Sequence, residues 1–157
     1  MASIHLTTFI AAPVERVFDL SRHLAIYKLA FQGRKAEFRS GAASSLLDVG
    51  ETISILGKIA GKNRLTMLKI TKLQKPASFT EEQVKGDLEL YKHEHHFKPA
   101  ENGTIVIDLL EFGPPKDILG KIIAKIHMRK YLEEFISKRN EMIRNYAETE
   151  KWRAVLT

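Results

Sequence analysis

Two histidines and one aspartate stand where a hairpin could gather them. His93 and His95 are two residues apart, and Asp108 follows the dipeptide Asn102-Gly103. Alternate residues of a strand point to the same face, and Asn-Gly between two alternating segments is a strong signal for a two-residue hairpin turn. With that dipeptide as the turn, all three polar side chains should share one face of the hairpin. The predicted cross-strand pairs are Phe97 with Asp108, His95 with Leu110 and His93 with Phe112.

The rest of that face is aromatic and aliphatic, whereas the opposite face carries more charges, so we expect the first face to line the interior. Polar groups on such a wall have three alternative roles. They could orient the polar end of a ligand or act as acid and base with pKa values tuned by their surroundings. They could instead hydrogen-bond each other, the C-terminal helix or water, because buried polar groups need partners. The candidate catalytic residues are His93, His95 and Asp108.

Metal and cofactor chemistry find little support in the sequence. The zincin helix motif needs histidines at i and i+4, but the residue four positions after His93 is Phe97. The chain has no cysteine, which excludes thiolate nucleophiles and cysteine-held metal sites. Walker, Gly-x-Gly-x-x-Gly and Gly-x-Ser-x-Gly motifs are absent as well. We therefore predict no metal and no cofactor.

The segments around the hairpin alternate between apolar and polar residues and are separated by turn residues, which favours an antiparallel meander. Two short helices are expected between the first two strands, because Pro13 stands at a helix-start position and the apolar residues that follow recur at helical spacing. The second of these helices covers 23–31. The predicted strands are 4–10, 35–40, 51–59, 63–73, 78–85, 89–98 and 104–112.

A long helical region is predicted over roughly 116–149, and its apolar face changes midway. At about 100° per residue, the apolar residues from Leu119 to Ile126 fall on one side and those from Met128 to Tyr146 on the opposite side. A straight helix would bury one half and expose the other. We therefore predict a break or a change of packing partner near His127.

Length and charge fit a single globular domain over 1–157, with a core over about 3–147 and a fraying tail over 148–157. The net charge of +6 is concentrated near the C-terminus, where residues 116–153 hold ten Lys/Arg and six Asp/Glu. Acids alternate with these cations from Glu133 onward and no aromatic stacking motif accompanies them, so nucleic acid is not a predicted partner. The first residues lack a secretory signal and no apolar run could span a membrane, so we expect a cytoplasmic protein.

The order of strand, two short helices, six-stranded meander and long helix resembles the helix-grip fold of the START-like, or SRPBCC, superfamily. Several local segments resemble its bacterial polyketide cyclase/dehydrase-like branch. They are Phe9 to Leu20, His93 to Phe97 before the Asn102-Gly103 turn, Asp108, and Tyr131 to Asn140. The resemblance implies an α+β fold in which a curved seven-stranded antiparallel sheet wraps around the C-terminal helix. It also implies an apolar cavity between them, which many relatives use for lipids, sterols or polyketides.

This resemblance leads to one principal hypothesis and two alternatives, and it leaves the oligomeric state open. The principal hypothesis is a binder or carrier of a small hydrophobic molecule, such as a lipid, a polyketide or an isoprenoid-like compound, held between the sheet and helix 128–146. The first alternative is a polyketide cyclase/dehydrase-like enzyme that uses the cavity His and Asp as acid and base. The second is a membrane-docking or protein-interaction module, with transient membrane contact through the basic, apolar segment 119–130. The predicted ligand-binding residues are Ile53, Ile55, Leu68, Tyr91, His93, His95, Phe97, Leu110, Phe112, Tyr131, Leu132 and Phe135.

Overall fold

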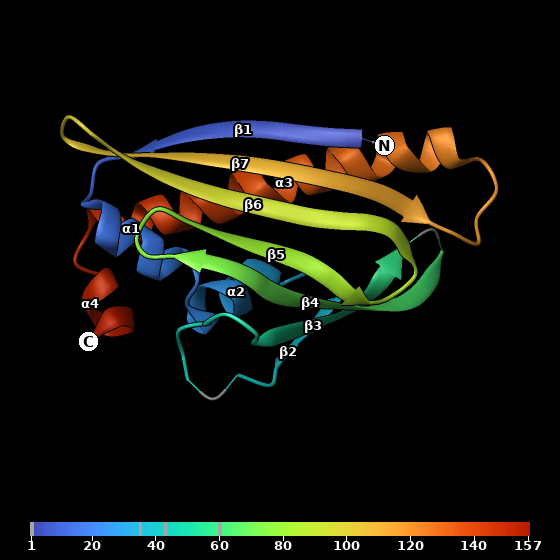
Figure 1. Ribbon diagram of the computed structural model, residues 1–157, viewed down its shortest axis with the longest axis horizontal. Coiled ribbons are helices and arrows are strands. Elements are labelled where there is room, and N and C mark those ends of the chain that lie inside the picture. Colours follow the sequence, from blue (N-terminus) through green and yellow to red (C-terminus); the bar gives the residue numbers. More distant parts are fainter. Residues whose placement is uncertain (1, 35, 43, 60) are drawn as a thin grey trace.

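The computed structural model describes residues 2–34, 36–42, 44–59 and 61–157 (Figure 1). A meander of strands is followed by one long helix, and two short helices separate the first two strands. The strands are β1 (Ala2–Ile10), β2 (Ala36–Ser40), β3 (Thr52–Ile59), β4 (Lys62–Gln74), β5 (Ser78–Lys85), β6 (Leu88–Ala100) and β7 (Gly103–Pro115). The helices are α1 (Val14–Ser21), α2 (Leu24–Phe31), α3 (Lys121–Glu148) and α4 (Trp152–Leu156).

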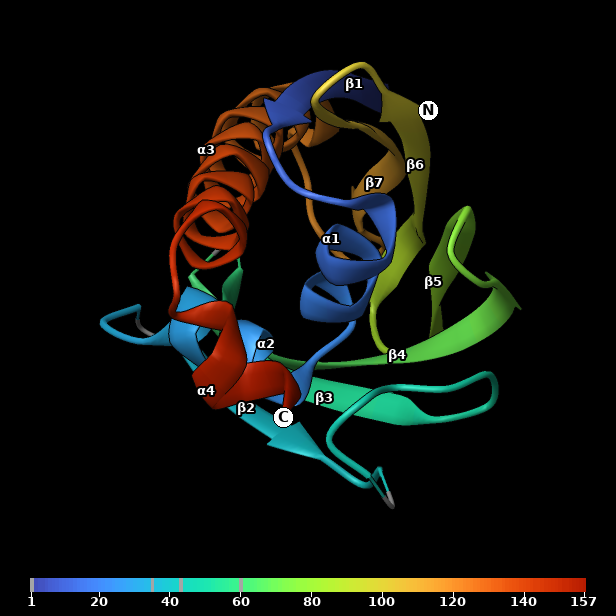
Figure 2. The ribbon, with the colours of Figure 1, turned by 90° about the vertical axis from the view of Figure 1, so that its left-hand side faces the viewer.

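The seven strands form one antiparallel sheet in the order β1-β7-β6-β5-β4-β3-β2. From β2 to β7 each strand pairs with its neighbour in the chain, and β7 then pairs with β1. The sheet curls around a space that α3 covers from the open side, while α1 and α2 lie at one end of that space (Figure 2). The predicted α+β fold class is thus confirmed.

The β6–β7 hairpin has a different register from the one predicted. Ala100 pairs with Gly103, so the two turn residues are Glu101 and Asn102, and Asn102 takes the positive φ of 62°. Gly103 already belongs to the strand, where a Cβ would lie only 2.4 Å from the carbonyl oxygen of Ile10. The predicted pairs are therefore wrong by two residues. The observed pairs are Phe97 with Val106, His95 with Asp108 and His93 with Leu110.

The long helix α3 neither begins at Lys116 nor breaks at His127. It starts after Gly120, whose φ of 70° is unsuited to a helix, and continues unbroken to Glu148. Residues 121–148 contain neither glycine nor proline, so nothing interrupts the backbone hydrogen bonds. The change of apolar face is accommodated by exposure, because Ile122 is 77% and Ile126 is 62% accessible to solvent.

Within the segment predicted to fray, Trp152–Leu156 forms the short helix α4, which packs against α1. The guanidinium of Arg16 stacks on the ring of Trp152 at 4.1 Å, a cation–π contact that joins the two helices. The tail therefore closes the end of the molecule at which α1 and α2 lie (Figure 2).

Candidate functional site

Two apolar clusters fill much of the space between the sheet and α3, and a layer of polar side chains separates them. Along β7, Asp108 stands between Val106 and Leu110, which belong to different clusters. The residues of this polar layer are almost inaccessible to solvent, so each needs a partner inside the protein. The layer consists of Tyr27, Glu81, His93, His95, Asp108, Arg139 and Asn140.

Asp108 is the centre of the polar layer. Its Oδ1 lies 2.9 Å from Nε2 of His93 and 2.9 Å from Nδ1 of His95. Its Oδ2 accepts a hydrogen bond of 2.7 Å from the side-chain amide of Asn140 on α3. One carboxylate of β7 therefore fixes two rings of β6 and ties the sheet to the C-terminal helix.

Glu81 on β5 holds the other side of His95. Its Oε2 is 3.6 Å from Nε2 of His95, and its Oε1 accepts a hydrogen bond from the hydroxyl of Tyr27 on α2. The ring of Phe79 stacks on His95 with a centroid distance of 4.3 Å. Neither nitrogen of His95 has a well-aligned hydrogen bond among the described residues. This ring is thus held by stacking and by two flanking carboxylates.

Opposing effects set the charges in the layer. Burial alone would raise the pKa of Asp108, but close contacts with the rings of His93 and His95 and their charge hold it well below its usual range. Burial also opposes ionisation of Glu81, whose pKa the contact with His95 nevertheless lowers. Burial together with the charge of His95 lowers the pKa of His93. For His95 the contacts with Asp108 and Glu81 outweigh burial and raise the pKa.

These directions place opposite charges side by side in the layer. Relative to their ordinary pKa values, Asp108 and Glu81 are shifted toward the anion, His95 toward the imidazolium and His93 toward the neutral ring. Arg139 adds a guanidinium, which lies 5.1 Å from the Tyr27 ring. Attraction between opposite charges reduces the cost of burying them.

A cavity of about 530 Å³ lies beside the polar layer, under the first half of α3. Its walls come from the end of α2, from β2, β3, β4 and β6, and from residues 127–135 of α3. The walls are mainly apolar, and Thr66, Tyr91 and Tyr131 add hydroxyl groups. The residues around it are Phe31, Arg34, Ala36, Ile55, Gly57, Lys58, Ile59, Arg64, Thr66, Leu68, Leu88, Tyr91, His127, Met128, Tyr131, Leu132 and Phe135.

Half of the predicted ligand-binding residues line this cavity. They are Ile55, Leu68, Tyr91, Tyr131, Leu132 and Phe135. The other half lie on the same inner face but outside the cavity walls. Of these, His93 and His95 belong to the polar layer, Ile53 and Phe97 to one apolar cluster, and Leu110 and Phe112 to the other.

The ring of Phe18 on α1 is one reason why part of the inner face is filled. It packs edge-to-face on Phe97 at 5.3 Å and on Phe79 at 5.9 Å. Sequence reasoning could predict α1 but not where its side chains insert. It also missed Gly57, Arg64 and Thr66, although alternation from Ile55 and Leu68 along β3 and β4 would have found them.

Two arginines of the cavity differ in what they contact. Arg34 follows α2, and its guanidinium carbon lies 5.2 Å from the ring centroid of Tyr131 and 4.9 Å from that of Phe135. It forms no ion pair with any other residue that the structure describes. The guanidinium of Arg64 on β4 instead forms ion pairs with Asp87 and Asp117. Of these two arginines, Arg34 is therefore the one whose charge is left for a ligand.

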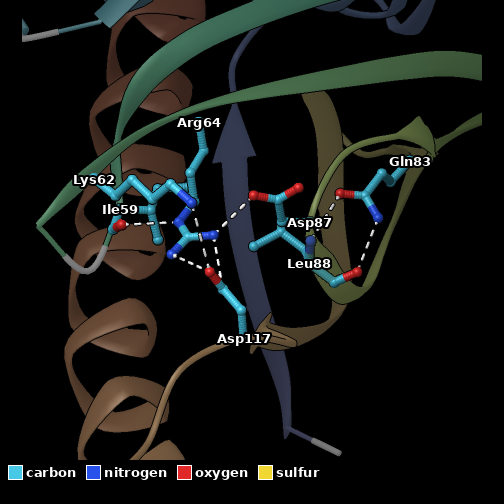
Figure 3. A network of polar contacts seen from close by, with 7 residues as sticks. All are labelled: Ile59, Lys62, Arg64, Gln83, Asp87, Leu88 and Asp117. Carbon is cyan, nitrogen blue, oxygen red and sulfur yellow. Dashed lines mark hydrogen bonds and ion pairs between the residues drawn. The ribbon is translucent and has the colours of Figure 1, made fainter.

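Arg64 joins three segments at the end of the cavity next to the β7–α3 loop (Figure 3). Its Nη1 lies 2.8 Å from Asp87 in the β5–β6 turn and 2.9 Å from Asp117 in the β7–α3 loop. Its Nε donates to the carbonyl of Ile59 at the end of β3. This buried guanidinium fixes the loop that leads into α3.

Glu81, His93 and His95 are the one group in the described part of the chain with metal-ligand geometry. Each offers a ligand atom, and these atoms lie within 4.8 Å of one another. Tyr27 and Asp108 already occupy positions next to these atoms. A cation would have to displace those contacts, so the arrangement favours the ion-pair layer over a metal centre.

Comparison with known proteins identifies the fold through structure alone. No family model matches the sequence, and no curated protein matches it. The structure of TTHA0849 from Thermus thermophilus is 19% identical, with 99% of this chain and 100% of that one covered, and has a TM-score of 0.67.

Two further structures have similar scores. A START superfamily protein from Mycobacterium smegmatis is 12% identical, with 93% of this chain and 97% of that one covered, and has a TM-score of 0.65. The ginseng major latex-like protein 151 from Panax ginseng is 10% identical at the same coverage, with a TM-score of 0.64. The chain therefore shares the helix-grip fold of these structures, as its sequence predicted. A fold shared at such identity does not assign an activity.

Proposed function

We propose that this chain binds a small, largely apolar molecule in the cavity under α3. The observation that carries the proposal is the cavity itself, because about 530 Å³ bounded mainly by apolar side chains is space that side chains do not fill. Ligand pockets commonly measure about 300–1,000 Å³ and combine apolar walls with a few polar groups. Lipids, polyketides and isoprenoid-like compounds are the ligand classes that such walls suit.

The polar groups around the cavity suggest how a ligand is oriented. The apolar body would lie against Leu68, Leu132 and Phe135. A polar end would meet Arg34 or the hydroxyl of Tyr91 rather than the two histidines, which are engaged with Asp108. No specific observation favours the enzyme alternative, since His93, His95 and Asp108 are not among the cavity walls.

Titration with N-phenyl-1-naphthylamine, a neutral apolar fluorescent probe, tests the proposal. Ala36 lines the cavity from β2, so Ala36→Trp should fill it and weaken probe binding by roughly tenfold or more. The matched control is Glu37→Trp, because Glu37 is exposed on the other face of the same strand. If both tryptophan variants bind the probe like the unaltered protein, cavity binding is refuted.

A second measurement addresses the identity of the ligand. Native mass spectrometry of protein purified from its own host should detect a co-purifying lipophilic molecule. The same preparation of Ala36→Trp should lack it, and Glu37→Trp should retain it. Retention by all three proteins would place the bound molecule outside this cavity.

A further inference from the structure

The loop before α3 and its first turns carry an apolar stripe, formed by Leu119, Ile122, Ile123 and Ile126. These are the four most exposed large hydrophobic side chains of the described residues, with 98%, 77%, 64% and 62% of their surface accessible. At about 100° per residue, the three isoleucines fall within an arc of about 100°. A contiguous exposed patch of this kind marks a contact surface more often than a single exposed leucine does.

Positive charge surrounds the apolar stripe. Residues 116–130 contain five Lys/Arg and a single acid, Asp117, which is paired with Arg64. Lys130 falls in the same helical arc as the isoleucines, and Lys125 borders it. Neither lysine forms an ion pair with another described residue. Over residues 116–130 the surface thus combines exposed aliphatic groups with two lysines that lack a carboxylate partner among the described residues, and Glu133, which follows in the same arc, is paired with Arg129.

The stripe also adjoins one end of the cavity. A second hollow at this end is lined by Leu119 and Ile123 together with Ile59, His127 and Met128. The last three residues line the main cavity too. The start of α3, the β7–α3 loop and the β3–β4 hairpin all lie at the same end of the molecule (Figure 1). Arg64 holds the loop there through Asp117 (Figure 3).

We propose that the apolar stripe docks on an anionic lipid bilayer. The aliphatic side chains would enter the boundary between headgroups and acyl chains, and Lys125 and Lys130 would lie at the level of the phosphates. This end of the cavity would then face the membrane, so an apolar ligand could pass between them without crossing water. This exchange rests on the proposed function, whereas docking itself does not.

The charges argue against a second copy of the chain as the occupant. A two-fold dimer places the same patch of both subunits face to face. The lysines of the two stripes would then be brought together, and like charges across an interface cost free energy. An anionic bilayer matches both the aliphatic groups and the cations.

Co-sedimentation with vesicles tests the docking. The full chain should bind vesicles of phosphatidylcholine mixed with phosphatidylglycerol and bind pure phosphatidylcholine far more weakly. Ile122→Gln/Ile123→Gln/Ile126→Gln should weaken binding to the mixed vesicles by roughly tenfold or more. Lys116→Glu/Lys125→Glu/Lys130→Glu should abolish the preference for them, and added salt should weaken binding of the unaltered protein.

The matched control is Leu56→Gln/Leu65→Gln, which removes an exposed apolar pair from the outer face of the sheet. This control should bind vesicles like the unaltered protein. Equal binding by the triple glutamine variant, or no vesicle binding at all, would overturn the proposal. So would a dimer in sedimentation velocity that the triple glutamine variant abolishes.

Docking and cavity binding can fail separately. Ala36→Trp should lose the naphthylamine probe and still bind vesicles, while the triple glutamine variant should do the reverse. A triple glutamine variant that loses both, at an unchanged melting temperature, would contradict the separation of the two surfaces.

Discussion

His95 on β6 stands directly opposite Asp108 on β7, with 2.9 Å between its Nδ1 and the carboxylate oxygen. The same oxygen lies 2.9 Å from His93, so the two rings are only 3.8 Å apart between centroids. Two imidazolium ions at that separation would repel each other strongly. The layer avoids this because the pKa of His95 is raised and that of His93 is lowered.

Replacing Asp108 should be costly for stability. Asp108→Asn leaves His95 with a single carboxylate partner, Glu81, and breaking a buried ion pair typically costs about 3–5 kcal/mol. The lowered pKa of Asp108 contributes stability that is present above the unfolded carboxyl pKa of about 3.9. That contribution is lost as pH falls through the lower folded pKa. Urea unfolding should therefore show a large deficit at pH 7 that shrinks in acid; a deficit independent of pH would contradict this assignment.

The two histidines should have opposite pH signatures. The raised pKa of His95 contributes stability below the unfolded pKa of about 6.5, and this is lost as pH rises through the folded pKa. The lowered pKa of His93 contributes stability above the unfolded pKa of about 6.5. This stability is lost as pH falls through the folded pKa. The cost of His95→Gln in urea unfolding should thus shrink toward pH 9, and that of His93→Gln toward pH 5.

Ligand binding separates this structural role from a role in the cavity. Because neither histidine is among the cavity walls, the naphthylamine probe should bind folded His93→Gln and His95→Gln with unchanged affinity. Weaker binding at full folding would instead assign the rings to the ligand.

The hairpin shows which part of the site the sequence could predict. Alternation placed His93, His95 and Asp108 on one buried face, and burial confirms that face. The turn was predicted one residue too late, which shifts the partner of each residue by two, and a shift of two preserves the face but changes every partner. The pattern within β6 and β7 contains no information about β1, whose Ile10 carbonyl oxygen leaves no room for a Cβ at residue 103.

Gly103→Ala should measure how much stability depends on the close approach of the Ile10 carbonyl oxygen to residue 103. The added Cβ would lie 2.4 Å from the Ile10 carbonyl oxygen and 2.7 Å from the ring of Phe9, and overpacking of this kind costs about 1–3 kcal/mol. Gly41→Ala is the matched control, because the nearest atom to its added Cβ is 4.0 Å away. Denaturant unfolding should show a loss for the first variant and little change for the second. Equal stability of the two variants would mean that β1 shifts to make room for the added Cβ.

For a related reason, of the break or change of packing partner predicted near His127, the break is absent from the long helix. The change of apolar face at His127 was correctly derived from the sequence, but burial of both faces was assumed. A helix without glycine or proline stays continuous, and here the first turns expose their isoleucines instead. Periodicity identifies an apolar face, whereas what covers it depends on the position of other elements.

The last prediction concerns the charge beside the cavity. The guanidinium carbon of Arg34 lies 5.2 Å from the ring centroid of Tyr131 and 4.9 Å from that of Phe135, and Arg34 lines the cavity without a carboxylate partner among the described residues. A ligand carboxylate would gain a charge-assisted hydrogen bond there. Arg34→Gln should therefore weaken the displacement of the naphthylamine probe by dodecanoate by roughly tenfold or more, and leave displacement by dodecanol unchanged. The matched control is Arg39→Gln, because Arg39 is exposed and paired with Glu37. If Arg34→Gln weakens displacement of the probe by dodecanoate and by dodecanol equally, the guanidinium only packs against the ligand.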